Sequence, residues 1–462
     1  MIFARVLSLF AVIVLALPAA AETRVPQSQT EISLGFAPLV KQAAPAVVNI
    51  YAKRVVQQRS SPFQDDPFFR QFFGDDLRGR PRVQNSLGSG VILSADGIVV
   101  TNFHVVGEAT EIRVVLNDRR EFDAQVMLAD QDSDLAILRL DGAEDMPHLF
   151  LRDSDSVEVG ELVLAIGNPF GVGQTVSSGI VSGLARSGVA TGSAWGYFIQ
   201  TDAPINPGNS GGALIDVNGR LIGVNTRILS RSGGSNGIGF AIPANLVSQF
   251  VTQARAGNAT FQRPWAGIGG QIVDADMAQS LGLDRPGGIV VSDLHPASPF
   301  LSAGLKQGDV VTHVQGEAVN TPAEMLFRMS VVGLGQKARI AYVRDGQADQ
   351  TQVAMMAAPE TPARQTTILG DRSNLPGMQL SNINPAVIAQ YGLALSASGV
   401  VVETPGPYGQ RVGLKPGDVL QNINGTDITT TSDAERALSE RRSTLSMDVK
   451  RGLKRLRLRF RL

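Results

Sequence analysis

Short apolar stretches separated by turn residues dominate the pattern of the chain. Their ranges are 47–52, 88–102, 112–116, 121–126, 135–140, 162–167, 179–183, 197–202 and 221–226. Within 88–102 the Asp96-Gly97 pair is typical of a hairpin turn. Short strands with turns at this spacing favour an antiparallel sandwich or a pair of barrels over a parallel sheet. The pattern therefore predicts a mostly β structure for this region.

Helical patterns are few. Residues 36–44 predict a short helix that ends before Pro45, and residues 244–256 predict an amphipathic helix that closes the β-rich region. The length of 462 residues indicates two to four domains rather than one core. The 49 glycines fit a chain with many tight turns.

Charge and cysteine content exclude several classes of function. The 41 basic and 42 acidic residues nearly balance, so we expect no nucleic-acid partner. The absence of cysteine excludes a disulfide framework and cysteine metal sites. We expect neither a metal ion nor a cofactor.

Residues 1–21 have the pattern of a secretory signal peptide. A positively charged start precedes a short apolar run, and an Ala-x-Ala sequence ends at Ala21. The alternative is an uncleaved anchor, although the run is short for a membrane span. We therefore expect a soluble, exported, periplasmic protein, with any membrane association peripheral.

A polar insertion at residues 57–86 interrupts the strand pattern. It is rich in Pro, Gly and Arg, yet four phenylalanines lie between Pro67 and Gly74. Either the loop folds onto its own core, or its aromatic side chains dock on another subunit.

Two similar segments mark the C-terminal half. Residues 302–319 recur as residues 411–428, each with Gly-Leu-Lys-x-Gly-Asp leading into a strand. A spacing of about a hundred residues is too long for a solenoid repeat and predicts two small domains. We place them at residues 263–357 and 374–462, with a linker at 358–373 rich in Pro, Thr and Arg.

Ser210 lies in the tight turn Gly208-Asn-Ser-Gly-Gly212 between two predicted strands. Glycines on both sides leave its hydroxyl uncrowded and let backbone N–H groups converge on one point, which suits a developing oxyanion. A serine among glycines is more often only a turn residue. Upstream partners change that interpretation.

The partners are His104, where a strand runs into a turn, and Asp134, in a polar bend that enters an apolar strand. A carboxylate there is costly unless a group such as an imidazole N–H pairs with it. We predict Ser210 as nucleophile, His104 as general base and acid, and Asp134 as its orienting partner. The predicted oxyanion hole consists of Gly208, Asn209 and Ser210.

These motifs, Thr101-Asn-x-His-Val-Val, Asp132-x-Asp-Leu-Ala and Gly208-Asn-Ser-Gly-Gly, resemble those of the HtrA/Deg family of exported serine proteases. The resemblance covers nearly the whole chain. It implies a chymotrypsin-like double β-barrel at residues 22–256, followed by two PDZ domains. It also implies that the 57–86 loop reaches a neighbouring subunit, and that the chain forms trimers and larger trimer-based assemblies with chaperone behaviour.

The resemblance further implies where substrate binds. A substrate strand would pair with residues after Asn225, namely Thr226, Arg227, Ile228, Leu229 and Ser230. The primary pocket would be apolar, with Ile205, Ile228 and Ile238 as candidates, and would favour cleavage after Val, Ala or Ile.

The first PDZ domain would seat a peptide carboxylate on the loop formed by Ala266, Gly267, Ile268, Gly269 and Gly270. The matching loop of the second, residues 375–380, contains Pro376, which removes a backbone donor. That domain either binds peptides weakly or serves assembly only. The basic stretch 450–462 alternates in the manner of a half-exposed strand, and membrane-surface or nucleic-acid binding is its alternative.

The expected function is therefore ATP-independent endoproteolysis of unfolded or misfolded envelope proteins. A Walker-type phosphate-binding loop does not occur in the sequence, which fits energy-free proteolysis. The alternative from another class is a non-proteolytic PDZ scaffold or holding chaperone.

Overall fold

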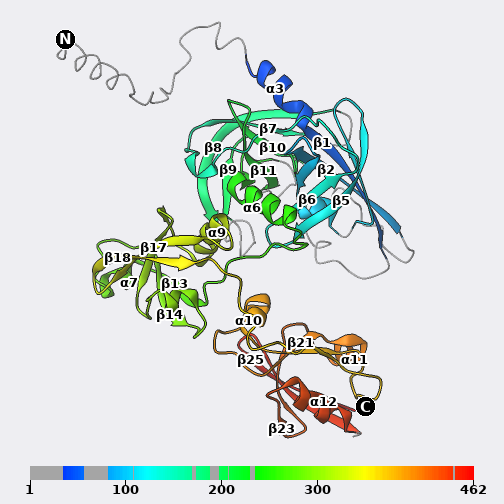
Figure 1. Ribbon diagram of the computed structural model, residues 1–462, viewed down its shortest axis with the longest axis vertical. Coiled ribbons are helices and arrows are strands. Elements are labelled where there is room, and N and C mark those ends of the chain that lie inside the picture. The colour runs from blue at the N-terminus through cyan, green and yellow to red at the C-terminus, as the bar shows by residue number, and fades with distance from the viewer. Residues whose placement is uncertain are drawn as a thin grey trace, which may run out of the picture. The chain divides into compact units, whose positions relative to one another are not determined.

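The computed structural model describes residues 35–56, 82–107, 109–168, 173–187, 197–206, 208–228, 235–440 and 443–461 (Figure 1). The predicted signal peptide and most of the 57–86 insertion lie outside these ranges. Among the helices described, none has the length and apolar character needed to cross a bilayer.

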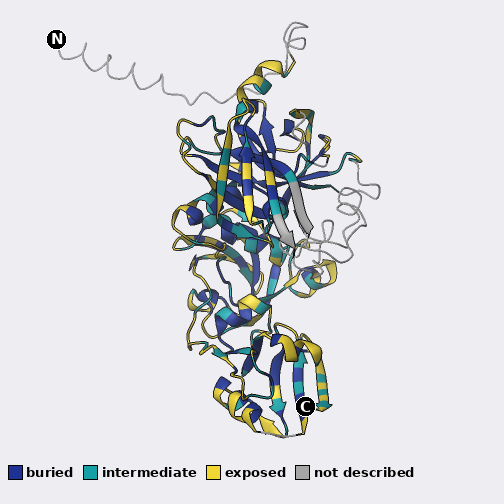
Figure 2. Cartoon of the chain, turned by 90° about the vertical axis from the view of Figure 1, so that its right-hand side faces the viewer, coloured by how far each residue is buried: buried dark blue, intermediate teal, exposed yellow. Residues whose placement is uncertain are grey.

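The first β-rich region forms a closed barrel in the order β1-β2-β3-β6-β5-β4. Its strands are β1 (Val47–Val56), β2 (Arg82–Ile92), β3 (Ile98–Thr101), β4 (Glu111–Val115), β5 (Glu121–Asp130) and β6 (Leu135–Leu140). The hairpin predicted at Asp96-Gly97 joins β2 to β3, and Gly97 has the positive φ of 78° that such a turn requires. Figure 2 shows the buried residues running along these strands.

The second closed barrel has the order β10-β11-β12-β9-β8-β7. Its strands are β7 (Leu162–Gly167), β8 (Thr175–Ser187), β9 (Tyr197–Thr201), β10 (Ala213–Asp216), β11 (Leu221–Ile228) and β12 (Gly239–Pro243). Its core is small and aliphatic, and includes Ile199, Ile205 and Leu214. The prediction of a pair of antiparallel barrels is thus confirmed.

Helix α3 (Ala37–Ala43) comes before the barrels in the chain. The short helices of the barrel region are the 3₁₀ turn Ala44–Ala46, α5 (Phe103–Val106), the 3₁₀ turn Ser154–Ser156 and α6 (Ala244–Arg255). Helix α6 is the predicted closing helix, and it buries Leu246, Val247 and Phe250 along one face. The extended chain after it packs back on α6, because Phe261 stacks on Phe250 with 4.0 Å between ring centroids.

The two repeat segments each belong to a small antiparallel sheet. The first sheet has the order β13-β14-β15-β17-β18 and the second the order β19-β20-β21-β22-β24-β25, with β16 pairing β15 and β23 pairing β22.

The elements of the first domain are β13 (Ile268–Ile272), α7 (Ala275–Ser280), β14 (Ile289–Leu294), α8 (Pro299–Ser302), β15 (Val310–Val314), β16 (Glu317–Ala318), α9 (Pro322–Val332), β17 (Lys337–Arg344) and β18 (Gln347–Ala354).

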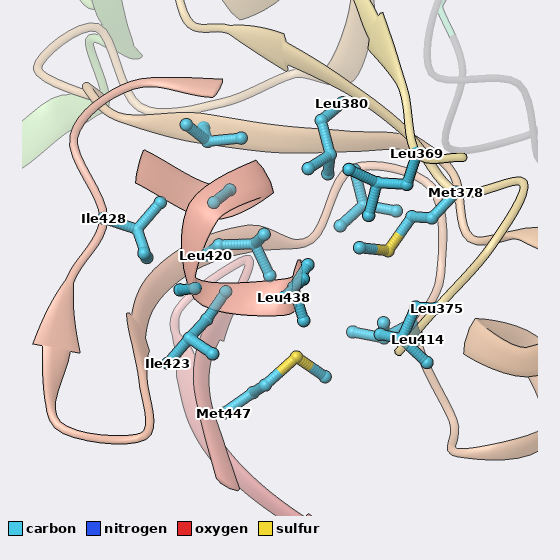
Figure 3. Close-up of a cluster of buried hydrophobic side chains, with 14 of the residues drawn as sticks. Leu369, Leu375, Met378, Leu380, Leu414, Leu420, Ile423, Ile428, Leu438 and Met447 are labelled. Atoms are coloured by element: carbon cyan, nitrogen blue, oxygen red, sulfur yellow. The ribbon is translucent and has the colours of Figure 1, made fainter. Parts of the chain in front are cut away.

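The elements of the second domain are β19 (Thr367–Ile368), β20 (Gln379–Asn382), α10 (Pro385–Tyr391), β21 (Val400–Thr404), α11 (Gly406–Arg411), β22 (Val419–Ile423), β23 (Thr426–Asp427), α12 (Thr431–Ser439), β24 (Thr444–Arg451) and β25 (Lys454–Arg461). Its core is drawn in Figure 3.

The repeated Gly-Leu-Lys-x-Gly-Asp motif makes the same turn in both domains. The Asp309 carboxylate accepts the backbone N–H of Lys306 at 2.7 Å, and that of Asp418 accepts the N–H of Lys415 at 2.9 Å. An arginine from the last hairpin then closes each turn, Arg344 on Asp309 and Arg451 on Asp418. The basic stretch at the C-terminus forms β25, whose side chains alternate between exposed and half-buried as predicted.

Candidate active site

Only glycine fits at the two positions that follow Ser210 in its turn. A Cβ atom on Gly211 would lie 2.1 Å from the Ser89 carbonyl oxygen, and the φ of Gly211 is +82°. A Cβ atom on Gly212 would lie 2.2 Å from the Ile166 carbonyl oxygen. The turn packs directly against backbone from both barrels, and neither position therefore tolerates a side chain.

His104 enters the site from the first barrel. It is part of the one-turn helix α5, which follows β3. Its backbone N–H donates to the Oδ1 atom of Asp134 at 3.1 Å, and its ring Nδ1 lies 2.9 Å from both carboxylate oxygens. These contacts fix the imidazole in position and orient its other nitrogen away from Asp134.

Asp134 lies in the tight turn between β5 and β6, with a left-handed φ of +53° that Asp adopts more readily than most residues. The side-chain amide of Asn102 donates to its backbone carbonyl at 2.9 Å. Burial opposes ionisation of the carboxyl group, but His104 and the hydrogen bonds from His104 and Thr226 outweigh it and hold the pKa of Asp134 below its ordinary value. The carboxylate is therefore ionised at neutral pH.

Thr226 connects the carboxylate to the serine. Its hydroxyl donates to the Oδ2 atom of Asp134 at 2.6 Å, and its backbone carbonyl accepts the Ser210 hydroxyl at 3.1 Å. It lies at a bulge in β11, where the pairing with β12 shifts between Asn225 and Arg227. A bulge turns one side chain out of the regular alternation, which directs this hydroxyl at the carboxylate. The three residues predicted as a triad therefore lie together, His104 and Asp134 in the first barrel and Ser210 in the second.

Ser89, which the sequence analysis did not single out, joins the serine turn to the first barrel. It is fully buried in β2. Its backbone N–H donates to the Ser210 carbonyl at 2.9 Å, and its hydroxyl donates to the Gly208 carbonyl at 2.5 Å. Ser89 itself accepts hydrogen bonds from Thr101 and from the backbone N–H of Asn168. Its position between two glycines is the only sequence signal, and that signal is too common to identify such a role.

The predicted oxyanion residues have different surroundings. Gly208 has a φ of +96°, and its carbonyl is held by Ser89. The backbone N–H of Asn209 donates to the Asn206 carbonyl at 2.9 Å, so it stabilises the turn itself. The side chain of Asn209 is also buried and accepts a hydrogen bond from Thr175 at 2.7 Å. The backbone N–H groups of Gly208 and Ser210 are thus the candidate donors.

The predicted specificity residues lie on the second barrel. Ile205 is 1% exposed and belongs to the aliphatic core, and Ile228 is half-buried against the same cluster. A Cβ atom on Gly239 would lie 2.8 Å from the Ile205 side chain, so this isoleucine packs directly over the glycine. Arg227 and Ile238 are half-buried. Leu229 and Ser230 lie outside the described residues.

The sequence also matches families of known proteins. A trypsin-like peptidase domain matches residues 88–224, and PDZ domains match residues 266–355 and 399–451. The periplasmic pH-dependent serine endoprotease DegQ of Escherichia coli K12 is 35% identical over 419 residues, which cover 90% of this chain and 89% of DegQ. The periplasmic serine endoprotease DegP of the same organism is 36% identical over 398 residues, covering 86% of this chain and 81% of DegP.

The chain belongs to the DegP/DegQ family of serine endoproteases. A solved structure of the HtrA-type protease AlgW with a decapeptide is 42% identical, with a TM-score of 0.52, and covers 70% of this chain and 99% of that one. The predicted family, fold class and enzyme class are thus confirmed. The periplasmic location expected from the sequence agrees with the names of these relatives.

In this Deg-family chain, an arginine beyond the barrels holds the turn that carries Asp134. Arg263 donates to both carboxylate oxygens of Asp130, at 3.1 and 2.5 Å, and to the Ser133 hydroxyl at 2.8 Å. Asp130 in turn accepts the backbone N–H of Ser133 at 2.8 Å. Arg263 could not be predicted from the sequence, because no local pattern links it to a turn more than a hundred residues upstream.

The predicted carboxylate-binding loop of the first PDZ domain leads into the edge strand β13. Gly267 has a φ of +61°, and a Cβ atom there would lie 2.8 Å from the Trp265 ring. The Ser298 hydroxyl donates to the Ala266 carbonyl at 2.6 Å, and the backbone N–H of His295 donates to the Gly267 carbonyl at 2.8 Å. Ile268 and Ala266 pack against the domain core, while Gly269 and Gly270 pair with β14. Within the described residues no group of side chains suits a metal ion.

Proposed function

We propose that this chain is a periplasmic, ATP-independent serine endopeptidase that degrades unfolded or misfolded proteins. The observation that carries the proposal is the connected set of contacts from His104 through Asp134 and Thr226 to Ser210. In the proposed mechanism, Ser210 attacks the peptide carbonyl, and His104 accepts the serine proton and then donates it to the leaving amine.

The buried, ionised Asp134 supports this proton transfer. It fixes the imidazole tautomer in which the outer ring nitrogen acts as the proton acceptor, and it stabilises the imidazolium that forms. The tetrahedral oxyanion would be bound by the backbone N–H groups of Gly208 and Ser210. Losing one such donor typically costs about 2.7–4 kcal/mol of transition-state stabilisation.

Substrate would add as a strand beside residues 226–230, with an aliphatic side chain in the pocket lined by Ile205, Ile228 and Ile238. Cleavage after Val, Ala or Ile would follow, because none of these three side chains could balance the charge of Lys or Arg. We further propose that the first PDZ domain captures substrate C-termini on residues 266–270. Family resemblance adds homotrimers, larger trimer-based assemblies and chaperone activity to the proposal.

Two measurements test the proposal together: covalent labelling of the chain and cleavage of a denatured substrate by it. A serine-reactive phosphonate should label one residue per chain, Ser210, and the Ser210→Ala variant should lose casein cleavage by about 10⁶-fold. A labelled chain that kept cleaving casein, or a Ser210→Ala variant that did so, would refute the mechanism. A chain that took up no phosphonate but still bound denatured casein would instead be a non-proteolytic scaffold or holding chaperone.

A further inference from the structure

The two PDZ domains differ at the strand edge where such domains bind their ligands. In the first domain β13 is the outermost strand of the sheet, as far as the described residues extend. In the second domain β20 takes the equivalent place beside β21, but β19 pairs with its outer edge. PDZ domains bind an extended peptide by adding it as a strand to this edge. Residues of the chain itself therefore occupy the position of a ligand.

The backbone pairing is that of an antiparallel strand. Thr367 lies opposite Leu380, and Ile368 lies opposite Gln379. At one end the backbone N–H of Leu369 donates to the Met378 carbonyl at 2.9 Å. At the other end the backbone N–H of Asn382 donates to the Arg364 carbonyl at 2.6 Å. An incoming peptide would need these same donors and acceptors of the edge strand (β20).

The loop before β20 is engaged as well. Residues 375–380 are the predicted counterpart of the carboxylate-binding loop of the first domain, and in a PDZ complex the backbone N–H groups of such a loop would hold the terminal carboxylate of a peptide. Here the N–H of Gly377 donates to the carbonyl of Leu369 at 2.8 Å. The backbone carbonyl of Leu369 thus takes the place of the C-terminal carboxylate of a peptide ligand.

The side chains of Leu369 and Ile368 are also placed like those of a bound peptide ligand. Leu369 is 2% exposed and packs in the core cluster with Leu375, Met378, Leu380 and Leu438 (Figure 3). Its neighbour Ile368 is 67% exposed, as expected for the alternate residue of an added strand. The apolar site between the loop, β20 and α12 is therefore filled by a leucine from the segment predicted as a linker.

We propose that Thr367–Leu369 is a built-in ligand of the second PDZ domain, which leaves that domain closed to peptide C-termini. A ligand tethered by a few residues has a high effective concentration and excludes free peptides of ordinary affinity. The PDZ family match of this domain, residues 399–451, begins beyond both β19 and β20, so it covers neither the built-in strand nor its partner. The inference concerns the groove alone and does not rest on the proposed proteolytic mechanism.

Hydrogen–deuterium exchange on the full-length Ser210→Ala chain tests the proposal directly. The probe is a synthetic peptide of residues 360–369 with a free C-terminal carboxylate. Without peptide, the amides of Leu369 and Asn382 should exchange at least about 100-fold more slowly than in an unstructured chain. Saturating peptide should leave exchange in 364–382 unchanged. Rapid exchange of Leu369, or peptide-induced protection of 375–382 with deprotection of 364–369, would overturn the proposal.

Two variants on the same strand provide a matched pair. In the Ser210→Ala background, Leu369→Ala removes the buried side chain and should add one bound peptide per chain in a fluorescence-anisotropy titration with the labelled peptide. Ile368→Ala, which removes an exposed side chain, should leave the stoichiometry unchanged. A folded Leu369→Ala chain with no added site would count against the proposal. If that variant unfolds, the exchange measurement on the parent chain still decides.

Discussion

At the scale of single residues, Thr226 combines two roles that its sequence context does not reveal. The resemblance to known proteases places it in the strand that binds substrate, yet its hydroxyl contacts Asp134 and its carbonyl contacts Ser210. The regular alternation of a strand would not predict this, because the bulge at this position redirects the side chain.

Removing the Thr226 hydroxyl should therefore slow catalysis. Thr226→Val keeps the shape of the side chain but takes one hydrogen bond from a buried carboxylate, which is worth about 1.5–3 kcal/mol. We expect kcat/KM for a chromogenic peptide to fall roughly 10- to 100-fold. Thr226→Ser retains the hydroxyl and should keep most of the activity. Equal losses in the two variants would contradict this role.

Asp134 predicts a specific dependence of stability on pH. Its pKa in the folded chain lies below the ordinary value of 3.8, so the ionised form stabilises the fold at every pH above that value. This contribution disappears as the pH falls through the lower, folded-state pKa, since the carboxyl is then protonated in both states.

The test compares the free energy of unfolding of the parent chain with that of Asp134→Asn across a pH series. The difference between the two should be constant near neutral pH and shrink progressively below about pH 4. Denaturant titrations followed by circular dichroism would measure it. A difference that stayed constant down to pH 2 would show that Asp134 is not held ionised by its neighbours.

At the scale of elements, the serine turn predicts a sharp contrast between two glycines. Gly211→Ala forces a Cβ atom to within 2.1 Å of backbone, whereas a Cβ atom on Gly142, which also has a positive φ, meets nothing within 4 Å. We expect Gly142→Ala to cost about 1 kcal/mol of stability and leave activity intact. Gly211→Ala should abolish peptide cleavage, and retained activity there would mean that the turn can move.

The turn that carries Asp134 should depend on Arg263. Arg263→Gln removes the paired hydrogen bonds to Asp130 and the bond to Ser133, which leaves Asp134 less well positioned. We expect kcat to fall roughly tenfold with little change in KM, and Arg263→Lys to recover part of the loss. The control is Arg255→Gln, which breaks an exposed ion pair with Asp96 and should have no effect. A rise in KM with kcat unchanged would instead indicate that Arg263 acts in substrate binding.

The sequence pattern predicts helices, strands and turns well where local periodicity or turn chemistry alone determines them. The hairpin at Asp96-Gly97, helix α6 and the alternation of β25 all follow from local periodicity and turn chemistry. The roles of Ser89 and Arg263 depend on residues far away in the sequence, which no local pattern reports. Strand β19 has only two residues, so the sequence pattern predicts a linker there.

At the scale of the whole molecule, the structure indicates how much chain the peptidase unit needs. The sequence places its end at residue 256, before Phe261 stacks on Phe250 and before Arg263 binds Asp130. Gln262 also exchanges two hydrogen bonds with Gln253 of α6. The extended segment after α6 therefore packs as part of the barrel unit.

A pair of truncated chains tests this boundary. A chain of residues 22–256 loses the burial and stacking of Phe261, worth about 2–4 kcal/mol, whereas a chain of residues 22–264 keeps them. We expect the shorter chain to melt at least about 5 °C lower by calorimetry. Its specific activity should also be lower, because Arg263 is absent. Equal melting temperatures would place the boundary at residue 256 after all.

The division of the site between two barrels has a consequence for the timing of activity. During synthesis the first barrel is made first, with His104 and Asp134, and Ser210 follows 76 residues after Asp134. A half-made chain therefore lacks one of the three side chains of the proposed triad. The proposed triad is therefore complete only once both barrels have folded and Ser89 has formed its hydrogen bonds to Gly208 and Ser210.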